Sequence, residues 1–410
     1  MKRILLAAGV AVLAGGGLWM TLRRAPTGTL LDEPASPFKV ETAPPGWRVA
    51  FADGRLALRA LRWLTPHQPG LLVAQVQTQS DRQQVTVFRE GAAPTDLMVP
   101  RPQGVGEGYW RFARLEDARV LPDGSVLLLY LPGQAGDPSL AVCAEPGAGE
   151  ARWSVRGTFT RMDLGGGAEG AVFLYGQAGP VLRVPVPGAG KRPAPREIEL
   201  PPEAPSVDAL LATGPSSFLA ATPSGLSAWS AAKGWSHVAG PAERGLPCAE
   251  WRGSVVQAGR RFWWQAVPGR VAEVARDGSV IEDVEPGPLP AEDPFARDGR
   301  LLRLAGGDDK GRLWFAPAKP AVPADADPGG EWAAWLAAGL DRVYRWDPAR
   351  EGLERLAWGQ AWSLVRPPQD IPPGAPRLDP ASGSLLLEGP PGAVWWAPLT
   401  ALPFAPVQAR

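Results

Sequence analysis

The residue types that most often perform catalysis or bind metals are scarce in this chain of 410 residues. It contains two histidines, His67 and His237, and two cysteines, Cys143 and Cys248. A zinc site needs three or four such ligands close together, but His67 lies in the turn-like segment TPHQPG, far along the chain from His237. We therefore predict no metal, no cofactor and no histidine-based active centre, and we expect two free buried thiols.

Three short motifs resemble known sites but lack the context that such sites need. The G-x-G-x-x-G pattern at 165–170 joins two predicted strands, and no helix follows to bind a pyrophosphate. Ser36 and Lys39 match S-x-x-K within a Pro-rich segment that has no helix. The segment 325–336 begins like a calcium loop, but Leu336 occupies the twelfth position, where a bidentate Glu is required. We expect a hairpin turn at 165–170 and a plain linker segment at Ser36 and Lys39, and calcium bound by turn carboxylates stays an alternative.

Tryptophan is unusually frequent, with 18 residues against 11 Phe and 4 Tyr. Trp263 and Trp264 are adjacent in one apolar run, and Trp395 and Trp396 are adjacent in another. Adjacent side chains of a strand point to opposite faces of its sheet. We predict that these pairs pack in the core between sheets; the alternative is an aromatic platform for a glycan or a peptide.

The segment 317–340 interrupts the pattern of the chain and holds the candidate contact residues. Its first half is rich in proline, and its second half, EWAAWLAAGL, places apolar side chains on one helical stripe, namely Trp332, Trp335, Leu336 and Leu340. A helix of about ten residues is not stable alone in water, so the stripe must pack on the domain or on a partner. We predict Trp332, Trp335 and Leu336 as candidate partner or ligand contacts.

Residues 4–22 form an uncharged apolar run between Lys2-Arg3 and Arg23-Arg24. As a helix the run would span about 28 Å, close to the thickness of a bilayer core. A cleaved signal peptide with small residues near 14–17 is the alternative, but the run continues through Leu22, which favours an anchor. We predict a signal-anchor over 1–24, a Pro-rich linker over 25–45, and a single-pass membrane protein with its bulk in the periplasm. If the segment is cleaved, the protein is secreted.

From 46 to 410 the chain repeats short apolar runs bounded by Gly, Pro, Asp or Ser. The seven strongest begin at residues 70, 124, 170, 216, 260, 311 and 383, as GLLVAQV, GSVLLLY, GAVFLYG, SSFLAAT, RRFWWQA, GRLWFAP and GSLLLEG. Five of the six intervals are close to the length of a four-stranded propeller blade. The insertion at 317–340 accounts for the longer sixth interval.

Each run is apolar at consecutive positions, which indicates a strand buried on both faces. The segments between the runs are too short and too irregular for covering helices, so neighbouring sheets must cover each other. The sequence therefore predicts an all-β fold, a β-propeller of about seven four-stranded antiparallel blades over 46–410. Six or eight blades stay open, because the segment 46–64 could be a closing strand or part of another blade.

Three segments carry a resemblance to known propellers. FLAATPSGLSAWSAAKGW at 218–235 resembles the repeat of two-component-regulator-type propellers. DDKGRLWFAP at 308–317 and DRVYRWDPAREGLERL at 341–356 are similar to elements of the same propellers and of NHL-like or kelch-like blades. The resemblance implies a fold and no activity.

Charge excludes one class of function. Lys and Arg number 42 and balance 42 Asp and Glu, whereas a general nucleic-acid binder needs an excess of positive charge. We expect a membrane-tethered, envelope-facing binding or scaffolding module that is not an enzyme, with an envelope protein or a glycan as its partner. The alternatives are a propeller enzyme, such as a lyase or glycan hydrolase with axial carboxylates, and the sensor domain of a separate signalling protein.

Overall fold

A computed structural model of the chain describes most of the predicted strands. The described residues are 48–49, 62–64, 71–78, 82–89, 95–121, 123–134, 136–145, 151–165, 170–176, 179–186, 194–202, 204, 206–239, 253–265, 269–286, 302–317, 343–350, 352–356, 377–379, 384–388, 394–402 and 404–406. The predicted anchor at 1–24, the linker at 25–45 and the contact residues Trp332, Trp335 and Leu336 lie outside them. Among the helices that the structure describes, none is long and apolar enough to span a membrane.

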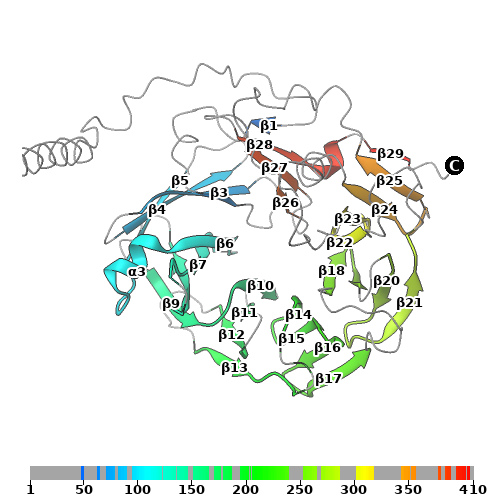
Figure 1. The fold of residues 1–410 in the computed structure, drawn as a ribbon, viewed down its shortest axis with the longest axis horizontal. Helices are drawn as coiled ribbons and strands as arrows, with labels where there is room; N and C mark the ends of the chain where they lie inside the picture. Colours follow the sequence, from blue (N-terminus) through cyan, green and yellow to red (C-terminus); the bar gives the residue numbers. More distant parts are fainter. Residues whose placement is uncertain are drawn as a thin grey trace, which may run out of the picture.

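Within the described residues, the strands form seven antiparallel sheets arranged around a central axis (Figure 1). The first four sheets, each from its inner to its outer strand, are β2 (Arg62–Leu64), β3 (Leu71–Thr78), β4 (Arg82–Arg89) and β5 (Thr95–Pro100); β6 (Arg114–Val120), β7 (Val126–Leu131), β8 (Ser139–Ala144) and β9 (Ala151–Gly157); β10 (Arg161–Gly165), β11 (Ala171–Tyr175), β12 (Val181–Pro185) and β13 (Arg196–Ile198); and β14 (Ala209–Gly214), β15 (Ser217–Thr222), β16 (Gly225–Ser230) and β17 (Gly234–Ala239).

The remaining three sheets include both ends of the described chain. They are β18 (Ser254–Ala258), β19 (Arg261–Gln265), β20 (Val271–Val274) and β21 (Val280–Val284); β22 (Leu302–Gly307), β23 (Leu313–Pro317), β24 (Tyr344–Asp347), β25 (Gly352–Leu356) and β29 (Phe404–Pro406); and β26 (Arg377–Asp379), β27 (Ser384–Glu388), β28 (Val394–Pro398) and β1 (Arg48–Val49). A 3₁₀ turn, η3 (Leu399–Ala401), follows β28. The all-β propeller fold predicted from the sequence is therefore confirmed.

The seven apolar runs occupy equivalent places in the seven sheets. Each run forms the second strand from the axis, namely β3, β7, β11, β15, β19, β23 and β27. The described side chains of these strands are almost entirely buried; all of β11, for example, is buried. A second strand has neighbours along both edges and a sheet over each face, which is why its consecutive positions are apolar.

The segment 46–64 holds two strands that belong to different sheets. Strand β1 pairs with β28 as the outer strand of the last sheet, and β2 is the inner strand of the first. The N-terminal end of the domain thus completes the sheet formed by its C-terminal end. The last strand, β29, crosses to the neighbouring sheet and pairs with β25.

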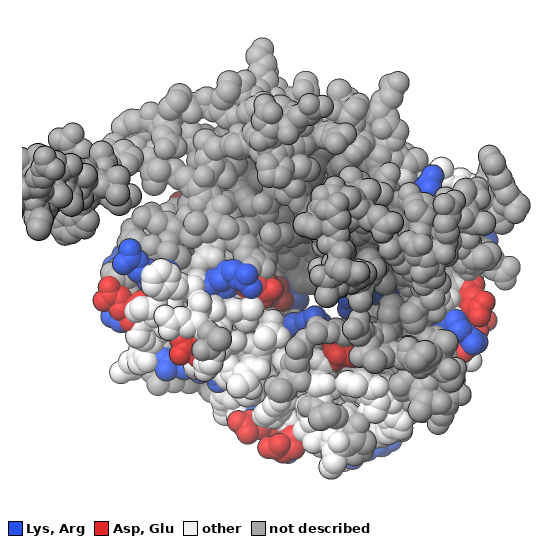
Figure 2. All heavy atoms as spheres, in the orientation of Figure 1, with Lys and Arg blue, Asp and Glu red and all other residues white. Residues whose placement is uncertain are grey.

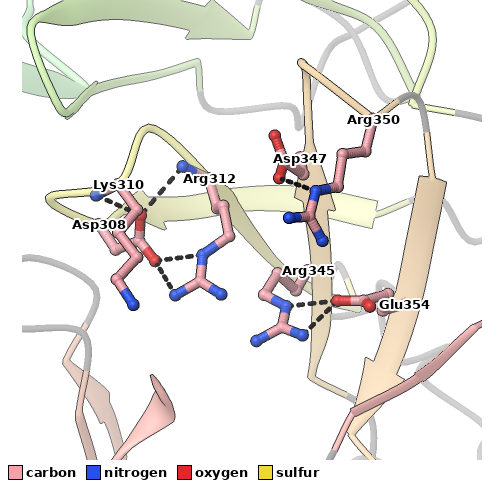
Figure 3. Close-up of polar contacts among 7 residues, drawn as sticks. All are labelled: Asp308, Lys310, Arg312, Arg345, Asp347, Arg350 and Glu354. Atoms are coloured by element: carbon pink, nitrogen blue, oxygen red, sulfur yellow. Dashed lines mark hydrogen bonds and ion pairs between the residues drawn. The ribbon is translucent and has the colours of Figure 1, made fainter.

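The sheet that receives β29 is held by ion pairs across its strands and turns (Figure 3). Arg345 of β24 donates from Nε to Glu354 Oε2 of β25 at 2.5 Å, and its guanidinium lies 4.3 Å from the ring centre of Phe404 in β29. In the turn before β23, Arg312 Nε donates to Asp308 Oδ2 at 2.7 Å. The C-terminal strand is therefore fixed by backbone pairing and by a cation–π contact.

The predicted insertion at 317–340 lies outside the described residues except for Pro317, so it stays a prediction. Strands β23 and β24 flank it and pair directly, with Phe315 opposite Tyr344. It therefore lengthens a single hairpin connection. Its own residues, 318–342, are outside the described part of the chain.

One helix was not predicted. The helix α3 (Glu107–Phe112) lies between β5 and β6 and contributes Trp110, which is fully buried. The Trp110 ring packs on Tyr130 of β7 with centroids 5.1 Å apart. Six residues contain too few apolar positions for a helical period to be recognised.

The core consists of apolar clusters between neighbouring sheets. Trp264 packs with Leu219 of the preceding sheet, whereas Trp263 packs with Leu304 of the next one. The prediction that adjacent tryptophans fill the core on opposite faces is confirmed for this pair. The side chains of Trp395 and Trp396 lie outside the described part.

Inner strands converge near the axis, so small residues are needed where they meet. A Cβ atom on Gly307 of β22 would lie 2.5 Å from both the Cβ atom of Ala258 and the carbonyl oxygen of Gln257 in β18. These neighbours belong to the backbone or are fixed to it, and they cannot rotate away. Glycine at 307 thus allows the two inner strands to approach closely.

We predict that Gly307→Ala lowers the free energy of unfolding by about 1 to 3 kcal/mol, because the added methyl group overpacks this contact. Denaturant-induced unfolding followed by Trp fluorescence measures the change. The control is Gly108→Ala in α3, where an added Cβ atom meets nothing within 4 Å and where alanine favours the helix. Equal stability of the two variants would contradict the close approach.

Candidate functional site

The inner strands enclose a cavity of about 820 Å³ on the axis of the propeller. Its walls are residues of β6, β10, β14, β18 and β22, together with Tyr175 of β11 and the turns after β18 and β22. Figure 2 shows a hollow at the centre of the molecule, with basic and acidic side chains at its edge. The charged residues that line the cavity are Arg119, Arg161, Arg303, Asp163, Asp308 and Asp309, three of each sign.

Three polar side chains of one sheet face the next sheet at this cavity. Arg161 of β10 lies directly opposite Tyr175 of β11 in the ladder, so both side chains are on one face of the sheet. Asp163 is two positions along β10 and shares that face. All three line the cavity.

These side chains bind the backbone of the next inner strand. Arg161 Nη1 donates to the carbonyl oxygen of Asp208 at 2.5 Å. The backbone N–H of Ala212 donates to Asp163 Oδ2 at 2.8 Å. Between them, the backbone of Leu210 hydrogen bonds to the Tyr175 hydroxyl. The backbone groups of residues 208, 210 and 212, at alternate positions along this segment, thus bind side chains of the preceding sheet. In a wider sheet, another strand would bind them.

The environment of Tyr175 keeps its hydroxyl group protonated. Burial raises the pKa of Tyr175 to about 12, and the negative charge of Asp163 acts in the same direction. Arg161, the bond to Leu210 and Arg119 oppose this shift in the pKa. The hydroxyl is therefore a neutral hydrogen-bonding group at neutral pH.

Two buried glutamines make the same kind of connection elsewhere. Gln265 of β19 donates from Nε2 to the Leu302 carbonyl oxygen at 2.9 Å and accepts from the Leu304 N–H at 2.6 Å. Gln75 of β3 donates to the Ala113 carbonyl oxygen at 3.1 Å and accepts from the Leu115 N–H at 3.0 Å. In each case one side-chain amide satisfies a carbonyl and an N–H two residues apart.

Two other charged groups of the lining, Arg119 and Asp308, also have structural partners. Arg119 of β6 forms an ion pair with Asp117 and donates from Nη2 to the Met162 carbonyl oxygen of β10 at 3.1 Å. Asp308 accepts from the Arg312 guanidinium (Figure 3). Arg119, Arg161, Asp163 and Tyr175 of the lining thus hold one sheet to the next, whereas Asp308 binds within its own turn.

The residues singled out in the sequence do not converge on this cavity. His237 is exposed on β17, and Cys143 is a free buried thiol in β8 whose pKa burial raises to about 11. Gly165 is the last residue of β10 and lies opposite Ala171 of β11, so the glycine-rich motif connects two strands as predicted, and its residues 166–169 are outside the described part. His67, Cys248 and the segment 325–336 are outside the described residues. In the described part, no group of three or more His, Cys, Asp or Glu residues is placed to hold a metal ion.

Sequence reasoning missed the residues that line the cavity. Arg161, Asp163 and Tyr175 lie in short strands whose composition is unremarkable. A weak signal existed for the glutamines, because Gln75 and Gln265 are polar residues within otherwise apolar runs. A buried polar residue usually has a specific hydrogen-bonding role.

Comparison with known proteins yields similarity of fold alone. No family model and no curated protein matches the chain. The Dos1 propeller is 7% identical with a TM-score of 0.46, and the match covers 87% of this chain and 94% of that one. The Cps50 (Swd1) β-propeller domain of Myceliophteria thermophila is 10% identical with a TM-score of 0.47, covering 83% and 97%.

An extracellular domain of a hybrid two component system from B. thetaiotaomicron is 10% identical with a TM-score of 0.41, covering 80% of this chain and 39% of that one. The resemblance to propellers that the sequence suggested is confirmed for the fold. The assignment of a propeller fold to this chain depends on the strand pairing described above.

We predict that Gln265→Ala lowers the free energy of unfolding by about 2 to 4 kcal/mol, because the Leu302 carbonyl and the Leu304 N–H lose their buried partner. Urea denaturation measures the loss. Gln257→Ala is the matched control: within the described residues, the side chain of this exposed glutamine bonds to the nearby Gly259 carbonyl oxygen alone, and we expect a change within about 0.5 kcal/mol. Similar values for the two variants would show that the bridging amide is not needed.

Proposed function

We propose that this protein is a membrane-tethered, envelope-facing propeller of seven blades that acts as a binding or scaffolding module and not as an enzyme. Its ligand would enter the axial cavity. The seven blades correspond to the seven sheets of the described residues. The membrane tether is inferred from residues 4–22 alone.

The observation that carries the proposal is the axial cavity of about 820 Å³. A cavity of this size is within the range of sites that bind small molecules or short segments of a partner. Arg119, Arg161, Asp163 and Tyr175 of its lining are bonded to neighbouring sheets, which makes this part of the wall rigid. A rigid cavity suits binding, because little conformational entropy is lost when a ligand is held.

A propeller enzyme is the competing function, because Asp163, Asp308 and Asp309 line the cavity. General acid–base catalysis needs a carboxyl group that is available to the substrate. Asp163 accepts the Ala212 N–H, and Asp308 is held by Arg312. These structural bonds favour binding over catalysis by these two groups.

We predict that a photo-crosslinking amino acid at Asp309, which is exposed and lines the cavity, joins the protein to one discrete partner in its native membrane. The same amino acid at Ala231, on an exposed turn of the β14–β17 sheet, should give no such product. Denaturing gels followed by mass spectrometry identify the adduct. Identical adducts from both positions, or none from Asp309, would remove the support for a ligand in the cavity.

We predict that the full-length protein sediments with membranes and resists carbonate extraction, whereas a chain that lacks residues 1–24 is soluble and folded. The reason is the apolar run at 4–22. Fractionation and immunoblotting measure the distribution. Mass spectrometry of the native protein is the decisive control, since a mature chain without residues 1–17 would show cleavage and exclude the anchor.

A further inference from the structure

Strand β21, the outer strand of its sheet, carries two adjacent apolar side chains that are exposed. Ile281 is 62% exposed and Val280 is 40% exposed. Among the large apolar residues of the described chain, Met98 and Phe112 are the only other exposed ones. An adjacent apolar pair on an outer strand is a feature of surfaces that bind another chain.

No neighbouring sheet covers β21. In the outer strands β5 and β9, buried residues alternate with exposed or half-buried ones, because the next sheet covers one of their faces. In β21, residues 280 to 283 are all exposed and Val284 is half-buried. The side chains on both faces of β21 are therefore accessible.

The outer edge of β21 has no strand beside it in the described part of the chain, where β21 pairs with β20 alone. The corresponding outer strand of the next sheet is β25, and there β29 adds as a fifth strand, with Phe404 opposite Leu356. Figure 1 shows β21, β25 and β29 on the outer circumference of the ring. An outer edge of this propeller thus accepts a short extended segment.

Charge makes pairing of β21 with a second copy of itself unfavourable. If two copies paired as antiparallel strands about their centre, Glu282 would lie opposite Glu282 and Ile281 opposite Asp283. Like charges directly opposite each other destabilise a pair of strands. A partner with basic residues at these places would be attracted instead, so the same residues reject one partner and select another.

The surroundings of the edge keep this negative charge. The carboxylates are Glu282, Asp283 and Glu285, all exposed. Arg270 forms ion pairs with Asp283 at 3.2 Å and with Glu285 at 3.6 Å, so three negative charges face one positive charge. In the turn before β21, Arg276 and Asp277 balance each other. The end of β21 is therefore acidic, and its beginning is apolar.

We propose that the outer edge of β21 binds an extended segment of a partner protein in which two basic residues precede two apolar ones. The segment would add as an antiparallel fifth strand, as β29 does on β25. Its basic residues would lie opposite Glu282 and Asp283, and its apolar residues would cover Val280 and Ile281. This site is on the circumference and is separate from the axial cavity, so it goes beyond the proposed function.

The probe is a labelled synthetic peptide, Ser-Thr-Arg-Lys-Val-Val-Thr-Ser, whose binding to the full-length protein in detergent is measured by fluorescence anisotropy. The control peptide has two glutamates in place of Arg-Lys. We expect the basic peptide to bind at least about tenfold more tightly than the acidic one. We also expect its affinity to fall as salt is added, because salt screens exposed charges.

Variants of the protein test whether β21 is the binding site. Glu282→Lys should weaken the basic peptide at least about tenfold and strengthen the acidic one, a reversal that loss of folding cannot produce. Ile281→Ser should weaken both peptides. The matched control is Glu197→Lys on β13, an exposed position in the outer strand of another sheet, and its affinities should stay within about threefold of the wild type.

Methylated peptides test whether the segment binds as a strand. A strand directs the N–H groups of alternate residues to one edge, so N-methylation of one alternate set should abolish binding and methylation of the other set should preserve it. Equal binding of the two methylated peptides, or equal effects of Glu282→Lys and Glu197→Lys, overturns the proposal. A dimer of the protein in analytical ultracentrifugation that Ile281→Ser abolishes also overturns it, since a second copy would then occupy the edge.

Discussion

The inner strand of every blade has one edge that no other strand can cover. A propeller places these edges around its axis, where each would expose a row of backbone N–H and C=O groups. In this protein, side chains from the preceding sheet bind those groups. Gln75, Arg119 and Gln265 each reach the inner strand of the next sheet, and Arg161, Tyr175 and Asp163 share one such strand. Sheets joined only by apolar packing could slide; these directional bonds fix how each sheet is placed on its neighbour.

The same constraint explains the composition of the innermost layer. Near the axis the strands are so close that Gly307 leaves no room for a Cβ atom beside Ala258. Farther out, the gap between sheets widens, and large rings such as Trp263 and Trp264 fill it. Packing without voids requires small residues at the axis and large ones farther out. The chain ends follow this pattern, since β1 and β29 are added to outer edges, where space is available.

The cavity is polar because residues that bind neighbouring sheets line it. Its arginines and aspartates are numerous enough to suggest chemistry, yet Arg119, Arg161 and Asp163 are engaged in bonds between sheets. A polar cavity is therefore not by itself a sign of catalysis. At one junction the residues differ, because Ala209 and Ala221 of the β14–β17 sheet occupy the positions that Arg161 and Tyr175 occupy in the β10–β13 sheet.

Local patterns predicted the repeat because the second strand of each sheet is buried on both faces, which makes its consecutive residues apolar. FLAAT and VLLLY needed no knowledge of distant segments to be recognised as buried strands, and their spacing predicted a propeller. The site could not be predicted in this way. Arg161, Asp163 and Tyr175 belong to hairpin partners, but their targets at 208, 210 and 212 lie in another sheet.

The all-β propeller fold could therefore be predicted from the sequence, and the insertion at 317–340 stays a prediction. Only the tertiary structure decided that the segment 46–64 divides between the first and last sheets, and that Tyr175, Ala221 and Gln265 occupy equivalent positions with different partners. The physical reason is how far apart in the sequence the interacting residues lie. Strand formation follows from the burial of neighbouring residues, whereas a cavity is defined by side chains that meet only when the sheets close around the axis.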